Sequence, residues 1–322
     1  MVKKIAVLTS GGDAPGMNAA IRAVVRAGRS FNLEVIGIHE GYKGLVEGGD
    51  NYEVMSRRSV TNIIARGGTI LGSARLPEFP QPEVREKGIQ QLKDAGIDAL
   101  IVIGGDGTYA GALRLHQHGI KCIGLPGTID NDIAGTDYTI GFDTCVNTVV
   151  EAIDKLRDTC GSHRRCAVVE VMGRHCGDIA RAAGLATGAE FIVTNTENND
   201  LQTILDQTKH FKEAGKRHPV IIVTEHLFDV IDLAKKIEEY SGMETRATIL
   251  GHIQRGGNPT PFDRVLATRL GDAAVDALMD GKSGVCMGVF NNEIIATPIT
   301  EAFGMTKNVF RKYAIPTNRS VR

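Results

Sequence analysis

The sequence has no charge imbalance and no long apolar runs. Its 37 Lys and Arg residues stand against 38 Asp and Glu residues, and the formal net charge is −1. A general nucleic-acid binder needs a broad basic surface, so this balance argues against a nucleic-acid partner. No apolar stretch approaches the roughly 20 residues of a membrane span, and the Met-Val-Lys-Lys start leads into a strand-like run rather than a signal sequence. We therefore expect a cytoplasmic protein with no membrane partner.

The sequence also has few cysteines and no segment that resembles a linker. Its six cysteines are scattered and form no C-x-x-C pair, so we predict buried free thiols. No low-complexity tract or Pro/Ser-rich stretch marks a domain boundary. A chain of 322 residues is nevertheless long enough for two lobes, each with a core of its own.

Short apolar runs alternate with amphipathic patterns along the chain. The runs, which are typical of buried parallel strands, cover residues 5–8, 99–103, 122–125, 167–169 and 220–223. The helical patterns cover residues 17–27, 84–95, 146–157, 201–214, 229–240 and 264–279. This alternation predicts an α/β fold whose sheets are mainly parallel and flanked by helices.

Glycines gather where the predicted strands end, which is the edge at which open α/β sheets bind ligands. The first glycine loop contains Gly11 and Gly12 and lies between a strand-like run and an amphipathic pattern. Glycines there let backbone amides approach a phosphate at a helix N-terminus. A lone Gly-Gly pair is a structural turn about two times in three, but a second glycine loop at residues 104–107 favours a phosphate site.

The second glycine loop carries one carboxylate, Asp106, among bare backbone amides, where it could hold Mg²⁺ beside phosphates. Residues 105–110 also match the G-x-G-x-x-A dinucleotide pattern, but the next strand-like run does not end in a ribose-binding acid. The Walker lysine loop is missing, because Asp276 stands where its first glycine belongs. We expect residues 281–283 to form only a helix C-cap and a turn.

Two carboxylates, Asp130 and Asp132, lie two residues apart just after the run at 122–125. Asp and Asn are common in surface turns, so a structural role is a fair alternative. A hydroxyl that attacks a phosphoryl group needs a proton acceptor, and a second acid can help to organise metal and water. We predict that Asp130 is this general base.

Five arginines are candidates for anion binding. Arg75, Arg174 and Arg255 lie beside small or glycine residues, and the planar guanidinium suits bidentate phosphate contacts. Taken singly, each has a roughly even chance of being an ordinary surface arginine, and their common placement in strand-end loops is the argument for function. Arg22 and Arg26 are four residues apart on a predicted helix, a like-charge spacing that costs stability unless an anion lies between them. We predict a second anion site there, with a solvated helix face as the alternative.

Together these segments resemble the bacterial ATP-dependent 6-phosphofructokinases over nearly the whole chain and in the same order. The resemblance implies phosphoryl transfer from MgATP to the 1-hydroxyl of fructose 6-phosphate, a glycolytic reaction, in a cleft between two lobes. It implies an ATP-binding lobe of residues 1–141 and 254–304 and a sugar-phosphate-binding lobe of residues 142–253 and 305–322. The residues implied in binding the nucleotide and Mg²⁺, with Asp106 as the metal ligand, are Gly12, Tyr42, Arg75, Leu76, Gly105, Asp106, Gly107 and Thr108.

The resemblance also implies a catalytic group and a sugar-phosphate site, with Asp130 taking the proton from the acceptor. The implied catalytic residues are Gly12, Arg75, Thr128, Asp130 and Arg174. The implied sugar-phosphate contacts are Thr128, Asp130, Asp132, Arg165, Met172, Gly173, Arg174, Glu225, Arg246, His252 and Arg255. In the family, Arg165 and Arg246 would reach into the site of a neighbouring subunit, so we expect a homotetramer.

The resemblance further implies an effector site for ADP or phosphoenolpyruvate, in which Glu190 would hold the effector's metal. The implied residues are Arg22, Arg26, Arg57, Arg157, Glu190, Lys216 and His218. Ala214 and Asn62 depart from the basic residue and the aspartate common in the family at these positions. Pyrophosphate-using members typically carry Asp and Lys where this chain has Gly107 and Gly127, so the two glycines favour ATP.

Three other functions compete with this one. A catalytically silent nucleotide sensor would have no need of the Asp130 and Asp132 pair, and we give it roughly one chance in twenty. A nicotinamide-dependent oxidoreductase is weakened by the missing ribose-binding acid, and a different kinase could share the loop at residues 104–108. Nucleotide titration followed by protection against unfolding would separate these classes.

Overall fold

A computed structural model of the chain describes residues 2–305, which form two compact units. The first unit comprises residues 2–129, 133–144 and 255–305, and the second comprises residues 130–132 and 145–254. The predicted assignment of residues 306–322 to the sugar-phosphate-binding lobe lies outside the described residues.

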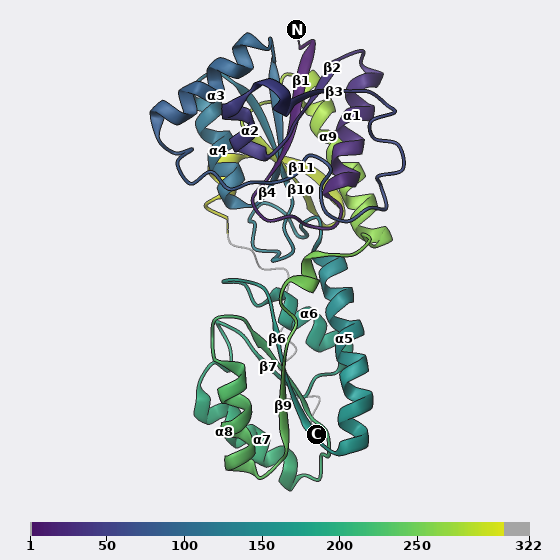
Figure 1. The fold of residues 1–322 in the computed structure, drawn as a ribbon, viewed down its shortest axis with the longest axis vertical. Coiled ribbons are helices and arrows are strands. Elements are labelled where there is room, and N and C mark those ends of the chain that lie inside the picture. The colour runs from purple at the N-terminus through teal and green to yellow at the C-terminus, as the bar shows by residue number, and fades with distance from the viewer. Residues whose placement is uncertain (1, 306–322) are drawn as a thin grey trace. The chain divides into compact units, whose positions relative to one another are not determined.

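The first unit is built on a seven-stranded sheet with the strand order β11-β10-β5-β4-β1-β2-β3 (Figure 1). Its strands are β1 (Lys4–Ser10), β2 (Glu34–Ile38), β3 (Tyr52–Met55), β4 (Ala99–Gly104), β5 (Lys121–Pro126), β10 (Val285–Phe290) and β11 (Glu293–Pro298). The five inner strands are parallel, and the edge strands β3 and β11 pair antiparallel with their neighbours. The predicted strands at 5–8, 99–103 and 122–125 are confirmed as the three central ones.

Helices cover both faces of this sheet, because its central strands are apolar on both sides. They are α1 (Met17–Ser30), α2 (Gly41–Glu47), α3 (Pro82–Asp94), α4 (Asp106–Gln117), α9 (Pro261–Met279) and α10 (Ile299–Ala302), with a 3₁₀ turn η1 (Gly49–Asn51). Figure 1 shows α1 and α9 on one face and α2, α3 and α4 on the other. The helices α1 and α9 pack closely at Gly271, where a side chain would not fit: an added Cβ would lie only 2.6 Å from the Ala23 Cβ.

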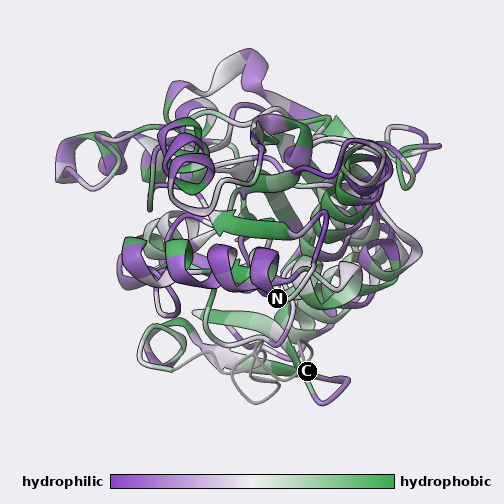
Figure 2. Ribbon diagram, turned by 90° about the horizontal axis from the view of Figure 1, so that it is seen from below, coloured by the Kyte–Doolittle hydropathy of each residue, from purple (hydrophilic) through white to green (hydrophobic). Residues whose placement is uncertain are grey.

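The second unit has a four-stranded, all-parallel sheet in the order β7-β8-β6-β9. Its strands are β6 (Cys166–Val171), β7 (Phe191–Val193), β8 (Val220–Thr224) and β9 (Thr245–Ile249). Its helices are α6 (Asp178–Thr187), α7 (Leu201–Glu213) and α8 (Val230–Ser241), and most of α5 (Phe142–His163) also belongs to it, as does most of the 3₁₀ turn η2 (Gly251–Arg255). The strands β6, β7 and β8 are mostly buried and apolar, whereas β9 is partly exposed and carries Arg246. Across the chain, Figure 2 shows hydrophobic strands and helices with hydrophilic stretches.

These two sheets confirm the predicted α/β class with mainly parallel strands flanked by helices. All six cysteines are free, five of them buried and Cys176 half-buried. The segment at Gly281 is a turn after α9, in which the Lys282 amide donates to the Ala277 carbonyl, as predicted.

Candidate active site

Three loops of the first unit meet where β1, β4 and β5 end side by side. The strand register aligns Ser10 with Gly104 and Gly104 with Pro126. The Thr108 hydroxyl donates to the Ser10 carbonyl over 3.1 Å, and a Cβ at Gly104 would lie 2.3 Å from that same oxygen. The glycine at position 104 is therefore required for the close approach of β4 to the first glycine loop.

A fourth segment approaches the same loops. A Cβ added at Gly12 would lie 2.3 Å from Nη1 of Arg255, so the guanidinium packs directly over this glycine. A Cβ at Gly67 would lie 2.2 Å from the Gly257 carbonyl oxygen. The structure thus brings Arg255, predicted to contact the sugar phosphate, against Gly12, predicted to contact the nucleotide phosphates.

The loop that carries Arg75 is anchored by side chains that the sequence patterns did not single out. Asn18, which is 1% exposed, donates to the carbonyls of Arg66 and Gly67 and accepts from the Ile70 amide. The buried Thr9 hydroxyl donates to the Gly72 carbonyl over 2.7 Å. Arg75 itself is exposed, so its guanidinium is accessible to a ligand.

Ser73 ties the Arg75 loop to the first glycine loop, because its hydroxyl donates to the Gly11 carbonyl over 2.6 Å. Leu76, also predicted at the nucleotide, is half-buried against the core on the α2, α3 and α4 side of the sheet. The sequence pattern around Ser73 and Leu76 did not predict these contacts.

Asp106 is the first residue of α4, and its carboxylate is exposed at the helix N-terminus beside Gly105 and Gly107. No atom lies within 4 Å of a Cβ added at either glycine, so the loop is open there. One exposed carboxylate beside a loop predicted to bind phosphate fits the way Mg²⁺ is held, by one or two carboxylates together with phosphate oxygens and water.

Tyr42 contacts the first turn of α4. Its hydroxyl donates to the Thr108 carbonyl over 2.6 Å, and its ring stacks on Phe79 with centroids 4.2 Å apart. Burial raises the pKa of the Tyr42 phenol well above its usual value. Tyr42 is only 5% exposed, so its observed role is to hold the first turn of α4, and its contact with adenosine remains a prediction.

The segment before the paired acids extends the edge of β5. The Thr128 amide donates to the Ile140 carbonyl over 3.1 Å, and the Thr139 hydroxyl donates to the Thr128 carbonyl over 2.7 Å. Asp130 follows as a buried residue with 9% exposure, and Asp132 is half-buried. Hydrogen bonds at Thr128 therefore fix the backbone just before Asp130 and Asp132.

Asp263 is a buried carboxylate that sequence reasoning missed. It lies in the first turn of α9 and accepts from the amides of Gly141 and Thr144 and from the Thr144 hydroxyl, so that it caps the N-terminus of α5. Burial raises the pKa of Asp263 to about 6, although these hydrogen bonds oppose the shift. Because Gly141 follows Ile140, this cap also fixes the segment paired with Thr128.

Four predicted sugar-phosphate residues of the second unit lie together just after β6 and β8, namely Met172, Gly173, Arg174 and Glu225. The amides of Gly173 and Arg174 both donate to Oε1 of Glu225, over 3.2 and 2.8 Å. The Met172 amide donates to Oε1 of Gln254, a fully buried residue that the sequence patterns did not reveal. His252, two positions before Gln254, is exposed.

Arg165 and Arg246 lie at the opposite end of the same sheet. Arg165 precedes the first residue of β6, and Nε of Arg165 is 2.8 Å from Oε1 of Glu244. Arg246 pairs with the same carboxylate and, over 3.5 Å, with Glu238. Gly173 lies beyond the other end of β6, so these two arginines are separated from it by the length of the strand, roughly 20 Å.

The predicted effector residues fall into two groups. In the second unit, Glu190 pairs with Arg157 over 3.5 Å and with Lys216 over 3.3 Å, and it also accepts from the Val220 amide. His218 lies 3.9 Å from a Cβ added at Gly161, in the same unit. The carboxylate that was predicted to hold a metal is thus engaged with two cations, and its metal role remains a prediction.

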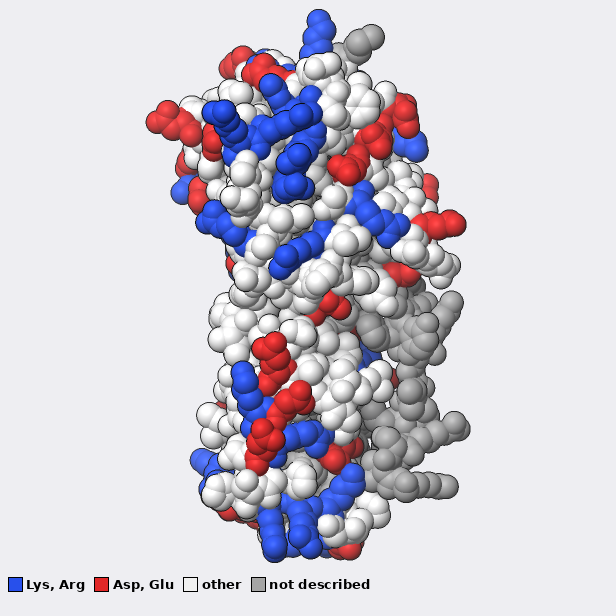
Figure 3. Space-filling view, turned by 90° about the vertical axis from the view of Figure 1, so that its right-hand side faces the viewer, with Lys and Arg blue, Asp and Glu red and all other residues white. Residues whose placement is uncertain are grey.

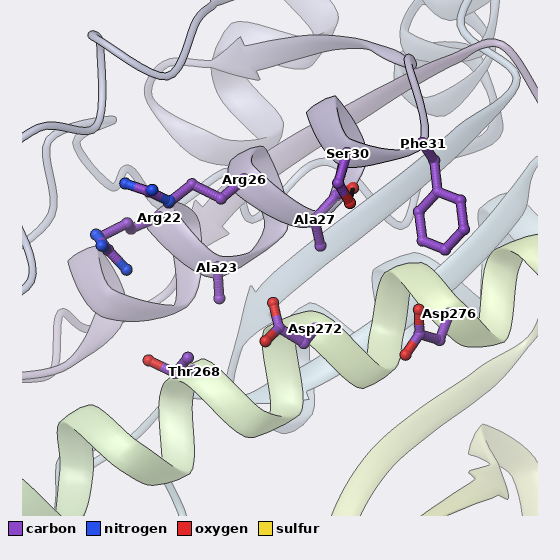
Figure 4. A pocket seen from close by; sticks show the side chains of 9 residues that line it. All are labelled: Arg22, Ala23, Arg26, Ala27, Ser30, Phe31, Thr268, Asp272 and Asp276. Carbon is purple, nitrogen blue, oxygen red and sulfur yellow. Dashed lines mark hydrogen bonds between the residues drawn. The ribbon is translucent and has the colours of Figure 1, made fainter.

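The other group borders an open groove of about 460 Å³ between α1 and α9. Figure 4 shows Arg22 and Arg26 extending side by side from α1, with Asp272 and Asp276 on α9. Burial and the neighbouring Asp276 raise the pKa of Asp272, and Arg22 opposes this shift. Asp272 thus supplies negative charge near the arginine pair.

Arg57 is exposed on the segment after β3, in the same unit as the groove. Figure 3 shows several Lys and Arg side chains on the side of this unit that faces the viewer. Among the described residues, no group of three His, Cys, Asp or Glu side chains could hold a metal ion. No helix within residues 2–305 is both long and apolar enough to cross a membrane.

The glycine loops of the first unit have the form of a phosphate-binding edge, and comparison with known proteins identifies the family. The family model described as Phosphofructokinase matches residues 4–278. The curated ATP-dependent 6-phosphofructokinase of Tolumonas auensis is 56% identical over 312 residues, 97% of each chain. The curated enzyme of the same name from Glaesserella parasuis is 55% identical over 322 residues, 100% of each chain. This chain belongs to the phosphofructokinase family, which confirms the predicted resemblance and the prediction of a kinase.

Solved structures agree with this fold. Pichia pastoris phosphofructokinase in the T-state superposes with a TM-score of 0.90 at 35% identity. The match covers 100% of this chain and 40% of the Pichia chain, so this chain spans less than half the length of that protein.

Proposed function

We propose that this chain transfers the γ-phosphoryl group of MgATP to the 1-hydroxyl of fructose 6-phosphate, giving fructose 1,6-bisphosphate and ADP in glycolysis. The convergence of the glycine loops at the ends of β1, β4 and β5 is the observation that carries the proposal. Such backbone-rich loops at helix N-termini suit a polyphosphate. The bacterial relatives that share more than half of its residues are named ATP-dependent 6-phosphofructokinases.

Phosphoryl transfer needs positioning and charge stabilisation more than covalent chemistry from the protein. In the proposed site, amides around Gly12 and Gly105 bind the phosphates, and Arg75 offsets charge on the transferred group. Asp106 would hold Mg²⁺, which neutralises charge on the phosphate oxygens when it is bound. Asp130 accepts the proton of the attacking hydroxyl, while Thr128 orients the acceptor.

Donor choice follows from two glycines. A Cβ at Gly127 would lie 3.0 Å from the Ile103 side chain and 3.1 Å from Met17, so a lysine there would need the core to shift. Gly107, by contrast, is open, which leaves room for a nucleotide phosphate. We expect turnover with ATP and none with pyrophosphate in one coupled assay, and turnover with pyrophosphate would overturn the donor assignment.

The base assignment is tested by Asp130→Asn. This change should lower kcat by about 10²-fold or more, with a much smaller change in the KM for fructose 6-phosphate. Asp137→Asn is a matched control, because its carboxylate accepts from the Asn291 amide over 2.9 Å and has no proposed catalytic part. Near-normal turnover of Asp130→Asn would remove Asp130 from the role of base.

Assembly and regulation extend the proposal. The distance of Arg165 and Arg246 from Gly173 within one chain supports their use in a neighbouring subunit's sugar-phosphate site. The homotetramer that the family resemblance implies is part of the same proposal. ADP and phosphoenolpyruvate are the proposed effectors, with Arg22, Arg26 and Glu190 among their contacts. A cytoplasmic location is part of the same proposal.

A further inference from the structure

Asn131 stands between the two acids, and both its backbone and its side chain are constrained. Its backbone has a φ of 53°, in the left-handed region, and its side chain is completely buried. Asn adopts this conformation more readily than most residues, because its short polar side chain can hydrogen-bond locally. Its Nδ2 donates to Oδ2 of Asp178 over 3.0 Å.

Asp178 is in turn held on its other oxygen. It is 7% exposed and is the first residue of α6, where a carboxylate is favoured by the helix dipole. Its Oδ1 lies 3.5 Å from Nη1 of Arg181. Asp178 is therefore a fixed acceptor rather than a mobile surface acid.

Arg181 extends this anchoring to the loop after β7. Its Nη2 donates to the Thr196 hydroxyl over 2.6 Å and to the Thr194 hydroxyl over 3.3 Å, and its Nε lies 3.4 Å from Glu197. The amides of Thr194 and Glu197 also bond to each other's carbonyls, which closes this loop. The result is a continuous polar chain from Asn131 to a hydrogen-bonded turn within one unit.

We infer that Asn131 and Asp178 are positioning residues for the proposed base: the Asn131 amide, clamped by Asp178, fixes the direction in which Asp130 leaves the loop. This inference rests on the proposed function of Asp130. A buried hydrogen bond to a charged acceptor is among the stronger ones in proteins. A misplacement of about 1 Å near the reacting atoms can cost about 10²-fold in rate.

Two single variants alter the Asn131–Asp178 hydrogen bond, one on the donor side and one on the acceptor side. Asn131→Gly keeps a residue that tolerates positive φ but removes the amide. Asp178→Asn keeps the shape but removes the charged acceptor. We expect each to lower kcat by about 10- to 100-fold, with the KM for ATP within about 3-fold of wild type.

The exchange Asn131→Asp with Asp178→Asn supplies the decisive measurement. Asn131→Asp alone places two carboxylates against each other and should lower kcat at least as far as Asn131→Gly. The double variant restores a carboxylate–amide pair with its polarity reversed. Its kcat should recover to within about 10-fold of wild type, above that of either single variant, an outcome that mere loss of structure would not give.

Asp130→Asn is measured beside these variants to keep the two claims apart. If Asp130→Asn loses turnover while Asn131→Gly and Asp178→Asn keep it, the positioning role is wrong and the base stands. If Asp130→Asn keeps turnover, the proposed base fails. A double variant whose kcat does not exceed that of both single variants also overturns the inference, and should Asp178→Asn not fold, the kcat of Asn131→Gly decides.

Discussion

The contact between Gly12 and Arg255 gives a prediction whose size follows from the geometry. A Cβ at position 12 would lie 2.3 Å from Nη1, 3.1 Å from Cζ and 3.5 Å from Nη2 of Arg255. Ordinary contact begins at about 3.4 Å, so Gly12→Ala forces the guanidinium to move by about 1 Å. The guanidinium ends a flexible side chain, so we expect the variant to fold and the cost to fall on catalysis.

A displacement of about 1 Å corresponds to a loss of about 10²-fold in kcat/KM, or about 2.7 kcal/mol of transition-state stabilisation. A coupled assay at varied fructose 6-phosphate measures this value for Gly12→Ala, Arg255→Ala and the double variant. If the methyl group acts through the guanidinium, Gly12→Ala should add little in the Arg255→Ala background.

Gly107→Ala is the control for this cycle. It lies in the nucleotide loop, yet no atom lies within 4 Å of its added Cβ, so its effect should be the same with and without Arg255. Strict additivity of Gly12→Ala and Arg255→Ala would refute the reasoning. The methyl group would then act on the nucleotide directly rather than by displacing Arg255.

Other predictions concern stability, sugar binding and regulation. Burial raises the pKa of Asp263 from 3.8 to about 6, so the folded state keeps this proton to a higher pH than the unfolded state does. The resulting stabilisation of the folded state is fully present below about pH 4. It is lost, by roughly 3 kcal/mol, as the pH rises through 6. Denaturation from pH 4 to pH 7 should show this loss relative to Asp263→Asn, and a pH-independent difference would contradict it. Gln254→Ala frees the Met172 amide and should raise the KM for fructose 6-phosphate several-fold in steady-state assays, with an unchanged KM disproving this role. Arg22→Ala and Arg26→Ala should abolish the rate response to ADP or phosphoenolpyruvate and spare the basal rate, and an undiminished response in both would refute the assignment.

Sequence patterns predicted the centre of the fold because the central strands are apolar on both faces. The runs at 5–8, 99–103 and 122–125 became β1, β4 and β5, and the helix predicted at 146–157 lies within the longer α5. The edge strands β3 and β11 escaped prediction because they are partly exposed. The strands β2 and β10 were also missed; both are mostly buried, but a glycine interrupts each apolar run.

The candidate site was partly predictable for a related reason. Glycines and acids that follow apolar strands indicate the ligand-binding edge of a sheet, so Gly12, Asp106 and Asp130 could be selected from the sequence. Asn18 and Asp263 could not, because their partners lie 48 to 122 residues away in the chain. A polar residue inside a helical pattern does not reveal which distant amide it will satisfy.

The length of β6 between Arg165 and Gly173 has a consequence for mixed assemblies. If the arginines of one chain serve the pocket of another, a preparation of Asp130→Asn chains and a preparation of Arg165→Ala chains are each inactive alone. Hybrids formed by dissociating and reassociating the two would contain some pockets that draw an intact acid from one parent and an intact arginine from the other. Mixing two inactive preparations would then restore activity, in proportion to the number of interfaces between unlike chains.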